Sequence, residues 1–325
     1  MIVAIAGGVG AARFLRGLLE VVPAEEVVAI VNTGDDTVFH GLHVSPDIDT
    51  VVYTTSGAID PDRGWGLAGE TWTAMGALQR YANAGAVTWF NLGDKDLATH
   101  LWRSGRLAEG ATLTEVTDEL RRSWDLGFRV LPMTDSRVRT MVHTADGTLG
   151  FQEYFVGKQH GVAVTGIDFD GVDSAQPAPG VLEAIASADT IVVCPSNPIV
   201  SIGPVLAVPG IREALVARRE DVVALSPIVA GAALKGPADR MLTELGHEAS
   251  VVGVARLYAP FVSTLIVDLA DEARAGDVMD AGVRCLVADT IMAKPGVGSS
   301  LARAALQATR ITRDHTAPST AQDLP

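Results

Sequence analysis

Short, continuously apolar runs alternate along this chain with segments whose apolar residues recur every three or four positions. Residues 2–6 form the first run and end in glycines, which is typical of a buried parallel strand. Residues 11–21 follow with apolar side chains at helical spacing, and residues 27–31 form the next apolar run. This succession of strand, glycine turn, helix and strand predicts a βαβ unit at the beginning of the chain.

The same alternation continues, with insertions, toward the end of the chain. Further strands are predicted at residues 87–92, 162–167, 190–194, 222–225, 261–267 and 284–288. Further helices are predicted at residues 71–81, 111–124, 179–186, 211–217, 237–245 and 301–309. Strands that alternate with helices indicate a mostly parallel sheet that is covered by helices on both faces.

We therefore expect an α/β fold, Rossmann-like and doubly wound, in one domain that spans residues 1–312. Residues 93–129 carry more helix than strand, so we expect a helical insertion or subdomain near the active site within residues 93–170. Residues 313–325 have almost no apolar periodicity, and we expect them to form a flexible tail.

Composition and charge restrict the class of ligand. Hydrophobic residues make up 48% of the chain and charged residues 20%, which is enough for a large buried core. The formal net charge is -14 and no run of Lys or Arg occurs, whereas binding of nucleic acid or of anionic membranes needs a basic surface. An anionic ligand would therefore be held by backbone N–H groups, by a metal ion or by a few placed cations.

The cysteines and the first residues exclude other classes of protein. Cys194 and Cys285 both lie in apolar runs, and we expect buried, reduced thiols rather than a disulfide framework. The beginning of the chain lacks the basic segment of a signal peptide, and no uninterrupted apolar run reaches membrane-spanning length. We expect a cytoplasmic protein.

The first candidate binding feature is the glycine-rich loop Gly7, Gly8, Val9, Gly10 and Ala11. Glycines between a strand and a helix let the backbone approach a phosphate, and the helix N-terminus offers free N–H groups. The dinucleotide-binding pattern does not fit, because an arginine occupies the place of its third glycine, and a Walker loop does not fit because no Gly-Lys-Ser/Thr follows. A tight turn that binds no ligand is the alternative.

The second candidate feature is a group of four carboxylates. Asp35 and Asp36 follow the second predicted strand, and Asp47 and Asp49 come a short step later. The carboxyl ends of strands are where doubly wound folds place their ligands, and carboxylate oxygens are ligands for Mg²⁺. An Asp-rich, solvated turn is the alternative.

Other polar loops are predicted to converge on the same edge of the sheet, because most of them also follow predicted strands. They contain Lys95 in NLGDKD, Ser196 and Asn197 in PSNPIVSIGP, and Lys235 in SPIVAGAALKGPAD. Aromatic residues are scarce, yet several of them cluster between positions 53 and 90, among them Tyr53, Trp65, Trp72, Trp89 and Phe90. Core packing is the default interpretation of each aromatic residue, and a wall for a flat heterocyclic substrate is the other.

Taken in order, the motifs resemble those of the CofD/FbiA transferases of coenzyme F420 biosynthesis. The resemblance rests on GGVGAARF, NTGDD, SPDIDT, NLGDKD, PMTDSR, FQEYFV, PSNPIVSIGP and SPIVAGAALKGPADRM, and GAIDPDRGWG is similar to the actinobacterial branch. Each motif is weak alone, but the ordered set, which reaches to about position 260, is specific. Ala11 and Ala230 depart from the pattern, since the family more often has glycine there.

The resemblance implies a reaction. The donor would be a guanosine diphosphate ester of phospholactate or phosphoenolpyruvate, and the acceptor the terminal ribityl hydroxyl of the deazaflavin Fo. The products would be F420-0 or its dehydro form, together with GMP. The family also implies dependence on Mg²⁺ and a homodimer.

The resemblance also implies roles for the candidate residues. Asp35 and Asp47 would bind the metal, and one of the catalytic aspartates Asp35, Asp47 and Asp49 would accept the Fo proton. The residues expected to bind the nucleotide are Gly7, Gly8, Val9, Gly10, Ala11, Lys95, Ser196, Asn197 and Lys235. The residues expected to bind Fo are Tyr53, Thr54, Trp65 and Trp89.

Two other functions compete with this interpretation. A YvcK-like protein of the same superfamily would share the glycine loop and NTGDD, and would bind a nucleotide sugar as a regulator without catalysis. An ordinary Rossmann oxidoreductase would bind NAD(P)H, but the missing third glycine and the excess of carboxylates argue against it.

Overall fold

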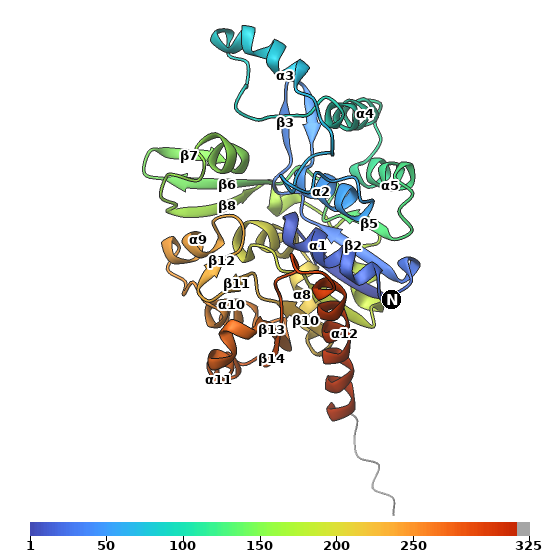
Figure 1. The fold of residues 1–325 in the computed structure, drawn as a ribbon, viewed down its shortest axis with the longest axis vertical. Coiled ribbons are helices and arrows are strands. Elements are labelled where there is room, and N and C mark those ends of the chain that lie inside the picture. The colour runs from blue at the N-terminus through green and yellow to red at the C-terminus, as the bar shows by residue number, and fades with distance from the viewer. Residues whose placement is uncertain (317–325) are drawn as a thin grey trace, which may run out of the picture.

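In the computed structural model, which describes residues 1–316 and the side chains of residues 1–309, seven parallel strands form a central sheet (Figure 1). Their order is β14 (Arg284–Ala288), β13 (Thr264–Asp268), β10 (Val222–Leu225), β9 (Thr190–Val193), β1 (Ile2–Ala6), β2 (Val27–Val31) and β5 (Arg129–Pro132). Every neighbouring pair is parallel. The structure therefore confirms the expected α/β fold with a doubly wound sheet.

The strands are apolar on both faces because helices cover both. In β1, Val3 and Ile5 belong to one hydrophobic core, while Ile2, Ala4 and Ala6 belong to the other. Side chains alternate between the faces of a strand, so a strand covered on both sides needs an apolar residue at every position. This is the physical reason why β1 is an unbroken apolar run.

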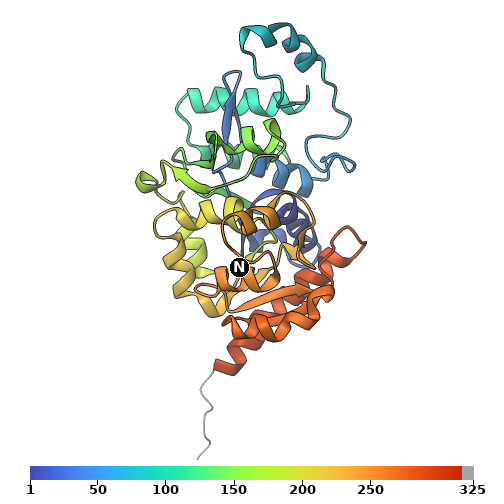
Figure 2. The same cartoon turned by 90° about the vertical axis from the view of Figure 1, so that its left-hand side faces the viewer.

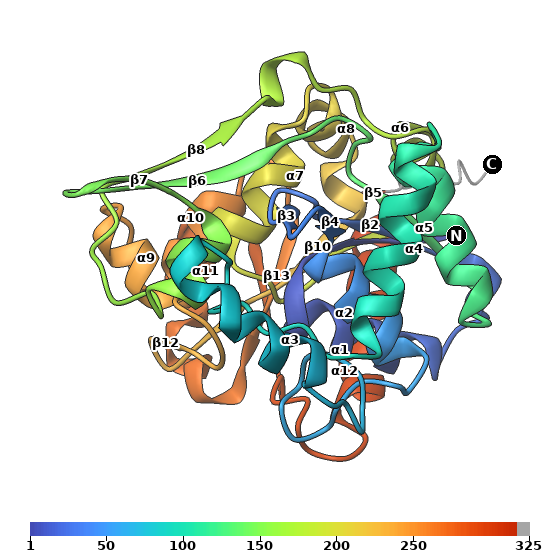
Figure 3. The same ribbon diagram turned by 90° about the horizontal axis from the view of Figure 1, so that it is seen from above.

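The helices form two layers, which Figure 3 shows on opposite sides of the strands. One layer contains α1 (Gly8–Leu19), α2 (Pro46–Thr55), α5 (Leu113–Ser123) and α12 (Val297–Thr316). The other contains α6 (Val181–Ser187), α7 (Gly203–Ala207), α8 (Ile211–Ala217), α9 (Ala238–Glu244), α10 (Val251–Tyr258) and α11 (Ala275–Asp280). Among the described helices, no single one has the length and apolar composition to cross a membrane; only the bent pair Pro198–Ala207 and Ile211–Ala217 meets both criteria together.

Smaller elements surround the carboxyl edge of the sheet. They are the hairpin β3 (Thr37–Phe39) and β4 (Leu42–Val44), the antiparallel sheet β6 (Arg139–Thr144), β7 (Gly147–Gly150) and β8 (Gly166–Asp170), the hairpin β11 (Ile228–Val229) and β12 (Ala232–Ala233), and the helices α3 (Thr73–Leu78) and α4 (Asp96–Ala108). Short 3₁₀ helices span Ala24–Glu26, Gln79–Ala84, Val172–Ser174, Arg219–Asp221 and Leu269–Arg274, and π-helical turns span Glu153–Gly157 and Pro198–Ile202. Figures 1 and 2 show α3 at the end of a segment that projects away from the sheet.

Several predicted boundaries differ from the structure. Residues 87–92 form no strand, because Val87 and Phe90 pack against a small core around Phe39 instead of pairing with a neighbouring strand. The strand predicted at 162–167 begins only at Gly166 and joins the antiparallel sheet through β6.

Residues 93–170 are not helical throughout. They contain α4 and α5, but also the edge strand β5 of the central sheet and the antiparallel sheet of β6, β7 and β8. Helix α12 continues to Thr316, four residues into the expected tail at 313–325. Residues 317–325 of that tail lie outside the described part of the chain.

The contact between α1 and α12 generates a prediction about stability. A Cβ on Gly17 would overlap the backbone of Gly298, so Gly17→Ala should lower the free energy of unfolding by about 1–3 kcal/mol, the usual effect of overpacking. Urea unfolding followed by circular dichroism measures the change. Gly105→Ala in α4 is the matched control, because a Cβ there meets open space and alanine favours a helix by up to ~1 kcal/mol. Equal effects of the two substitutions would contradict the proposed close packing.

Candidate active site

The glycine loop lies at the point where the order of the strands in the sheet reverses. Strand β1 pairs with β2 on one side and with β9 on the other, and the chain proceeds outward from β1 in both directions. In open α/β sheets, ligands bind in the crevice at this switch point, beyond the carboxyl ends of the strands. The loops that follow β1, β2 and β9 therefore meet where a ligand is expected.

The glycines of this loop allow three segments to pack closely. A Cβ on Gly10 would overlap the carbonyl oxygen of Pro195, and a Cβ on Gly7 would lie 2.7 Å from Cβ of Ser201 and 3.1 Å from Oδ2 of Asp47. Gly8 has φ of +70° and begins α1 without a side-chain cap. No side chain of the N-cap residue therefore covers the first N–H groups of α1, as a phosphate site requires, although Asp47 accepts a hydrogen bond from the N–H of Gly8.

Asp35 and Asp47 lie next to each other, as predicted from the sequence. Asn32, in the same loop after β2 as Asp35, connects this loop to Asp47 of α2. The Asn32 side chain donates a hydrogen bond of 2.9 Å to Oδ2 of Asp47 and accepts one of 2.8 Å from the backbone N–H of Gly34. The two aspartates are only 7% and 5% exposed. A pair of carboxylates is thus buried within reach of the first turn of α1.

Burial, and then the neighbouring charge of Asp47, raise the pKa of Asp35 well above its ordinary value. Burial also raises the pKa of Asp47 to about 6, although the Asn32 amide and the backbone N–H of Gly8 favour its charged form. Oδ1 of Asp35 is buried and has no hydrogen-bond partner in the part of the chain that the structure describes. Two adjacent buried carboxylates with an unsatisfied oxygen fit a divalent cation, because oxygen ligands and negative charge are what Mg²⁺ needs.

Asp49 does not join this pair. Residues two apart on a helix point about 200° away from each other, so Asp47 and Asp49 leave α2 in nearly opposite directions. Asp49 pairs with Arg103 of α4, whose Nη2 contacts Oδ1 and whose Nη1 donates a 3.1 Å hydrogen bond to Oδ2. The Arg103 side chain is 2% exposed, and this ion pair is therefore buried.

The ion pair belongs to a polar network that connects α2 with α4. Asp96 lies 2.7 Å from the Tyr53 hydroxyl and 3.4 Å from Nε2 of His100. Asp49, Asp96 and His100 are close enough together to hold a metal ion. The Arg103 guanidinium already neutralises Asp49 there and would repel a second cation, so we assign this group a structural role.

Asp36 interacts electrostatically both with the pair Asp35 and Asp47 and with the ion pair of Asp49 and Arg103. It accepts a 2.7 Å hydrogen bond from Ser45, the residue before α2, and its Oδ2 lies 3.6 Å from Nε2 of His43. Burial raises its pKa well above the ordinary value, while Ser45 and Arg103 act in the opposite direction. Burial and the charge of Arg103 lower the pKa of His43 to about 4, so His43 stays neutral near pH 7.

The four residues expected to bind Fo differ in exposure. Tyr53 and Thr54 are buried in α2, so neither presents a face to a ring. Trp65 and Trp89 are 42% and 37% exposed, and both pack against other groups. Trp65 shares the Arg63 guanidinium with Trp72, and Trp89 contacts Phe39 and Phe90.

The polar residues expected to bind the nucleotide also divide into two groups. Lys95 donates to the carbonyl of Ala68 over 2.7 Å, and Asn197 accepts hydrogen bonds at the beginning of the π-helical turn after it. Both side chains are therefore engaged by groups of the protein itself. Ser196 has a buried hydroxyl without a partner, and Lys235 forms no ion pair among the described residues.

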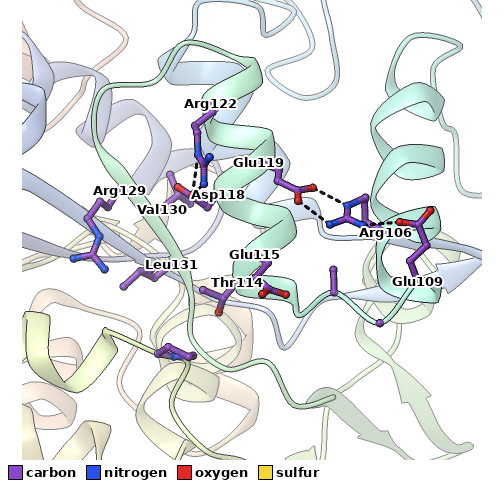
Figure 4. A pocket seen from close by; sticks show the side chains of 13 residues that line it. Arg106, Glu109, Thr114, Glu115, Asp118, Glu119, Arg122, Arg129, Val130 and Leu131 are labelled. Atoms are coloured by element: carbon purple, nitrogen blue, oxygen red, sulfur yellow. Dashed lines mark hydrogen bonds and ion pairs between the residues drawn. The ribbon is translucent and has the colours of Figure 1, made fainter.

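A separate surface cavity of about 610 Å³ lies between α4, α5 and β5 (Figure 4). Several of its acidic and basic side chains pair with one another, as Arg106 does with Glu119 and Arg122 with Asp118. None of the residues that line it belongs to the glycine loop or the carboxylate groups. We therefore place the active site at the switch point and not in this cavity.

Asn32 and the α4 residues of the network were not predicted as site residues. Asn32 lies inside the NTGDD motif, shortly before the carboxylates that the sequence marks as metal ligands. Asp96, His100 and Arg103 recur at helical spacing on the buried face of α4. Three ionisable residues on the buried side of one helix were a signal that could have revealed a polar network.

The comparison with known proteins identifies the family. A family model described as 2-phospho-L-lactate transferase CofD matches residues 2–290. The chain belongs to the CofD family. A phosphoenolpyruvate transferase of Kitasatospora aureofaciens is 48% identical over 94% of this chain and 96% of its own length. A 2-phospho-L-lactate transferase of Methanosarcina mazei is 38% identical over 93% of this chain and 98% of its own length.

Solved structures share the fold of this CofD family member at lower sequence identity. Protein BH3568 of Bacillus halodurans superimposes with a TM-score of 0.61 and 18% identity, over 94% of this chain and 98% of the other. At this identity the likeness shows a common α/β fold alone.

The buried ion pair between Asp49 of α2 and Arg103 of α4 generates a prediction about stability. Arg103→Met leaves Asp49 charged and buried without a partner, so it should lower the free energy of unfolding by about 3–5 kcal/mol. Arg106→Met on the same helix removes a partly exposed pair and should lower it by at most ~1 kcal/mol. Chemical denaturation measures both changes. Adding Asp49→Asn to Arg103→Met should recover part of the loss, and no recovery would show that Arg103 acts through packing alone.

Proposed function

We propose that this chain is a transferase of coenzyme F420 biosynthesis. It moves a phosphoenolpyruvyl or phospholactyl group from a guanosine diphosphate ester to the deazaflavin Fo and releases GMP. The family match supports this function, because it covers residues 2–290 and therefore the whole candidate site. The observation that carries the proposal is the buried pair Asp35 and Asp47 beside the glycine loop.

For the three-carbon group, we propose phosphoenolpyruvyl. Relatives that share 40 to 48% of their residues with this chain carry the name phosphoenolpyruvate transferase. The relative named 2-phospho-L-lactate transferase is 38% identical. The two groups differ by two hydrogen atoms, so the assignment rests on these similarities and not on a residue of the site.

For the metal, we propose that Asp35 and Asp47 hold Mg²⁺. When bound, the cation would neutralise the diphosphate and stabilise the charge that develops on departing GMP. Asn32 orients the Asp47 carboxylate through its amide. The N–H groups at the beginning of α1 would receive a phosphate, with the Ser196 hydroxyl as a further donor.

In this reaction the ribityl hydroxyl oxygen of Fo attacks the phosphorus atom that bears the three-carbon group. A bond forms between this oxygen and phosphorus, and the bond between phosphorus and the bridging oxygen of GMP breaks. The hydroxyl proton passes to a carboxylate of the Asp35 and Asp47 pair. The chain contributes mainly by holding the reactants in line and by neutralising charge.

For Asp49 and the residues expected to bind Fo, we propose roles that follow from their contacts and exposure. Asp49 is engaged by Arg103, and we propose that it positions α2 and does not accept a proton. Trp65 and Trp89 remain candidates for the Fo ring because both are partly exposed, whereas Tyr53 and Thr54 are buried. We also propose a homodimer, which sedimentation analysis would test.

A YvcK-like regulator is the competing function. It would bind a nucleotide sugar and would form no product with Fo. Incubation of the protein with Fo, Mg²⁺ and the enolpyruvyl or lactyl donor, followed by mass spectrometry, separates the two functions. We expect dehydro-F420-0 and GMP from the enolpyruvyl donor, with slower turnover of the lactyl donor. Nucleotide-sugar binding without turnover of either donor would favour the regulator.

Substitution of the buried pair tests the metal site. Asp35→Asn and Asp47→Asn should each reduce Mg²⁺-dependent release of GMP by at least about a hundredfold, because each removes a charged ligand. Neither should lower the melting temperature of metal-free protein, since each relieves repulsion between two buried carboxylates. Asp146→Asn at an exposed turn is the control. Near wild-type turnover of both variants would refute the assignment.

A further inference from the structure

Two cationic side chains converge next to the first helix without an acidic partner. Arg13 lies in α1, and Lys235 lies in the loop between β12 and α9. A Cβ at Gly64 would lie 2.7 Å from Nζ of Lys235 and 3.8 Å from Nη2 of Arg13, so the two charged ends approach the same point. Among the described residues, neither side chain forms an ion pair or hydrogen bond.

This arrangement is unusual in an acidic chain. The formal net charge is -14, and most arginines of the described region pair with a carboxylate. Here burial, followed by the charge of Arg13, lowers the pKa of Lys235. Two like charges that are brought together and left without a counter-charge favour binding of an anion.

The segment that carries Gly64 is a loop held together by its own hydrogen bonds. The backbone N–H of Gly64 donates a 2.8 Å hydrogen bond to the carbonyl of Asp60, and Ile59 forms a bridge with Leu67. The Arg63 guanidinium lies over the rings of Trp65 and Trp72. This stack fixes the loop, and the glycine leaves the space in front of the two cations free of a side chain.

The location suits a donor that is bound at the glycine loop. Arg13 follows Gly8 by five residues, which is about 7.5 Å along the helix axis, and side chains on a helix lean toward its N-terminus. The Arg13 guanidinium therefore reaches back toward the uncapped first turn of α1. Lys235, like Arg13, approaches Gly64, and it does so from the loops that follow β10, the neighbour of β9.

We propose that Arg13 and Lys235 together bind the anionic end of the donor, beneath the loop that carries Gly64. The inference rests on the proposed function, since the donor there is a guanosine diphosphate ester. Arginine binds a carboxylate or phosphate through two parallel N–H groups, and lysine adds a point charge. The oxyanion is either the distal phosphate or the carboxylate of the three-carbon group, and the experiment distinguishes the two.

The test compares wild type with Arg13→Met, Arg13→Lys and Lys235→Met by titration calorimetry in Mg²⁺. The probes are GMP, GDP and the guanosine diphosphate ester of enolpyruvate. Arg16→Met is the matched control, because Arg16 lies on the same helix, is exposed and belongs to no proposed site. Thermal melting of each variant shows whether it is folded.

Arg13→Met and Lys235→Met should each weaken binding of the ester about ten- to hundredfold and leave binding of GMP unchanged, as expected for the loss of charge-assisted hydrogen bonds. Arg13→Lys should recover part of the loss. A loss already present with GDP assigns the pair to the distal phosphate, and a loss confined to the ester assigns it to the carboxylate. Equal losses with GMP, or the same loss in Arg16→Met, would overturn the proposal.

Measuring turnover of Fo by the wild-type protein distinguishes failure of the proposed transferase function from failure of the proposed anion site. Product formation by wild type, with unchanged binding of all three probes in Arg13→Met and Lys235→Met, would uphold the transferase function and remove the anion site. Selective loss of GDP or ester affinity in a protein that never forms product from Fo would uphold the anion site and remove the transferase function.

Discussion

The burial of Asp35 and Asp47 next to each other is the constraint on which the rest of the site depends. Two carboxylates in a largely dry environment repel each other and lose their hydration, so the fold must supply compensation. The Asn32 amide and the N–H of Gly8 supply part of it, and one oxygen of Asp35 has no partner among the described residues. A third carboxylate, Asp49, is kept apart on the other side of α2, where Arg103 neutralises it. The fold thus separates the buried pair Asp35 and Asp47, for which we propose an external cation, from Asp49, which is neutralised by a cationic side chain of the protein.

This separation explains how the peripheral elements contribute. Arg103 contacts the carbonyl of His43 as well as Asp49, and so ties α4 to both α2 and the hairpin of β3 and β4. The first turn of α2 carries Asp47 against the glycine loop. The ion pair of Arg103 and Asp49 therefore helps to hold α2, and with it Asp47, in position against the glycine loop. It does so without contacting the expected ligand. Its desolvated charges make that position intolerant of small changes.

The sequence was sufficient for the central fold and for the convergence of the main loops, because strands apolar on both faces and the glycine turn are local patterns. It also brought together Asp35 and Asp47. It failed where tertiary packing decides, since Val87 to Phe90 is as apolar as a strand but packs around Phe39. Spacing likewise gave no sign that the buried Tyr53 hydroxyl bonds to Asp96. Asp49 was grouped with its neighbours by spacing, although helix geometry sends it the other way. The role of Asn32 depended on a contact fifteen residues distant, which no local pattern reveals.

The central position of β1 has a consequence for synthesis of the protein. The backbone at Pro195 and the side chain at Ser201, against which its glycine loop packs, are synthesised almost two hundred residues after that loop. At ordinary rates of translation this interval is on the order of ten seconds or more. During that time β1 has one of its two sheet neighbours, and α1 lacks the helix α12 that covers it. Between the synthesis of β2 and that of β9, one edge of the apolar strand β1 therefore has no strand to pair with.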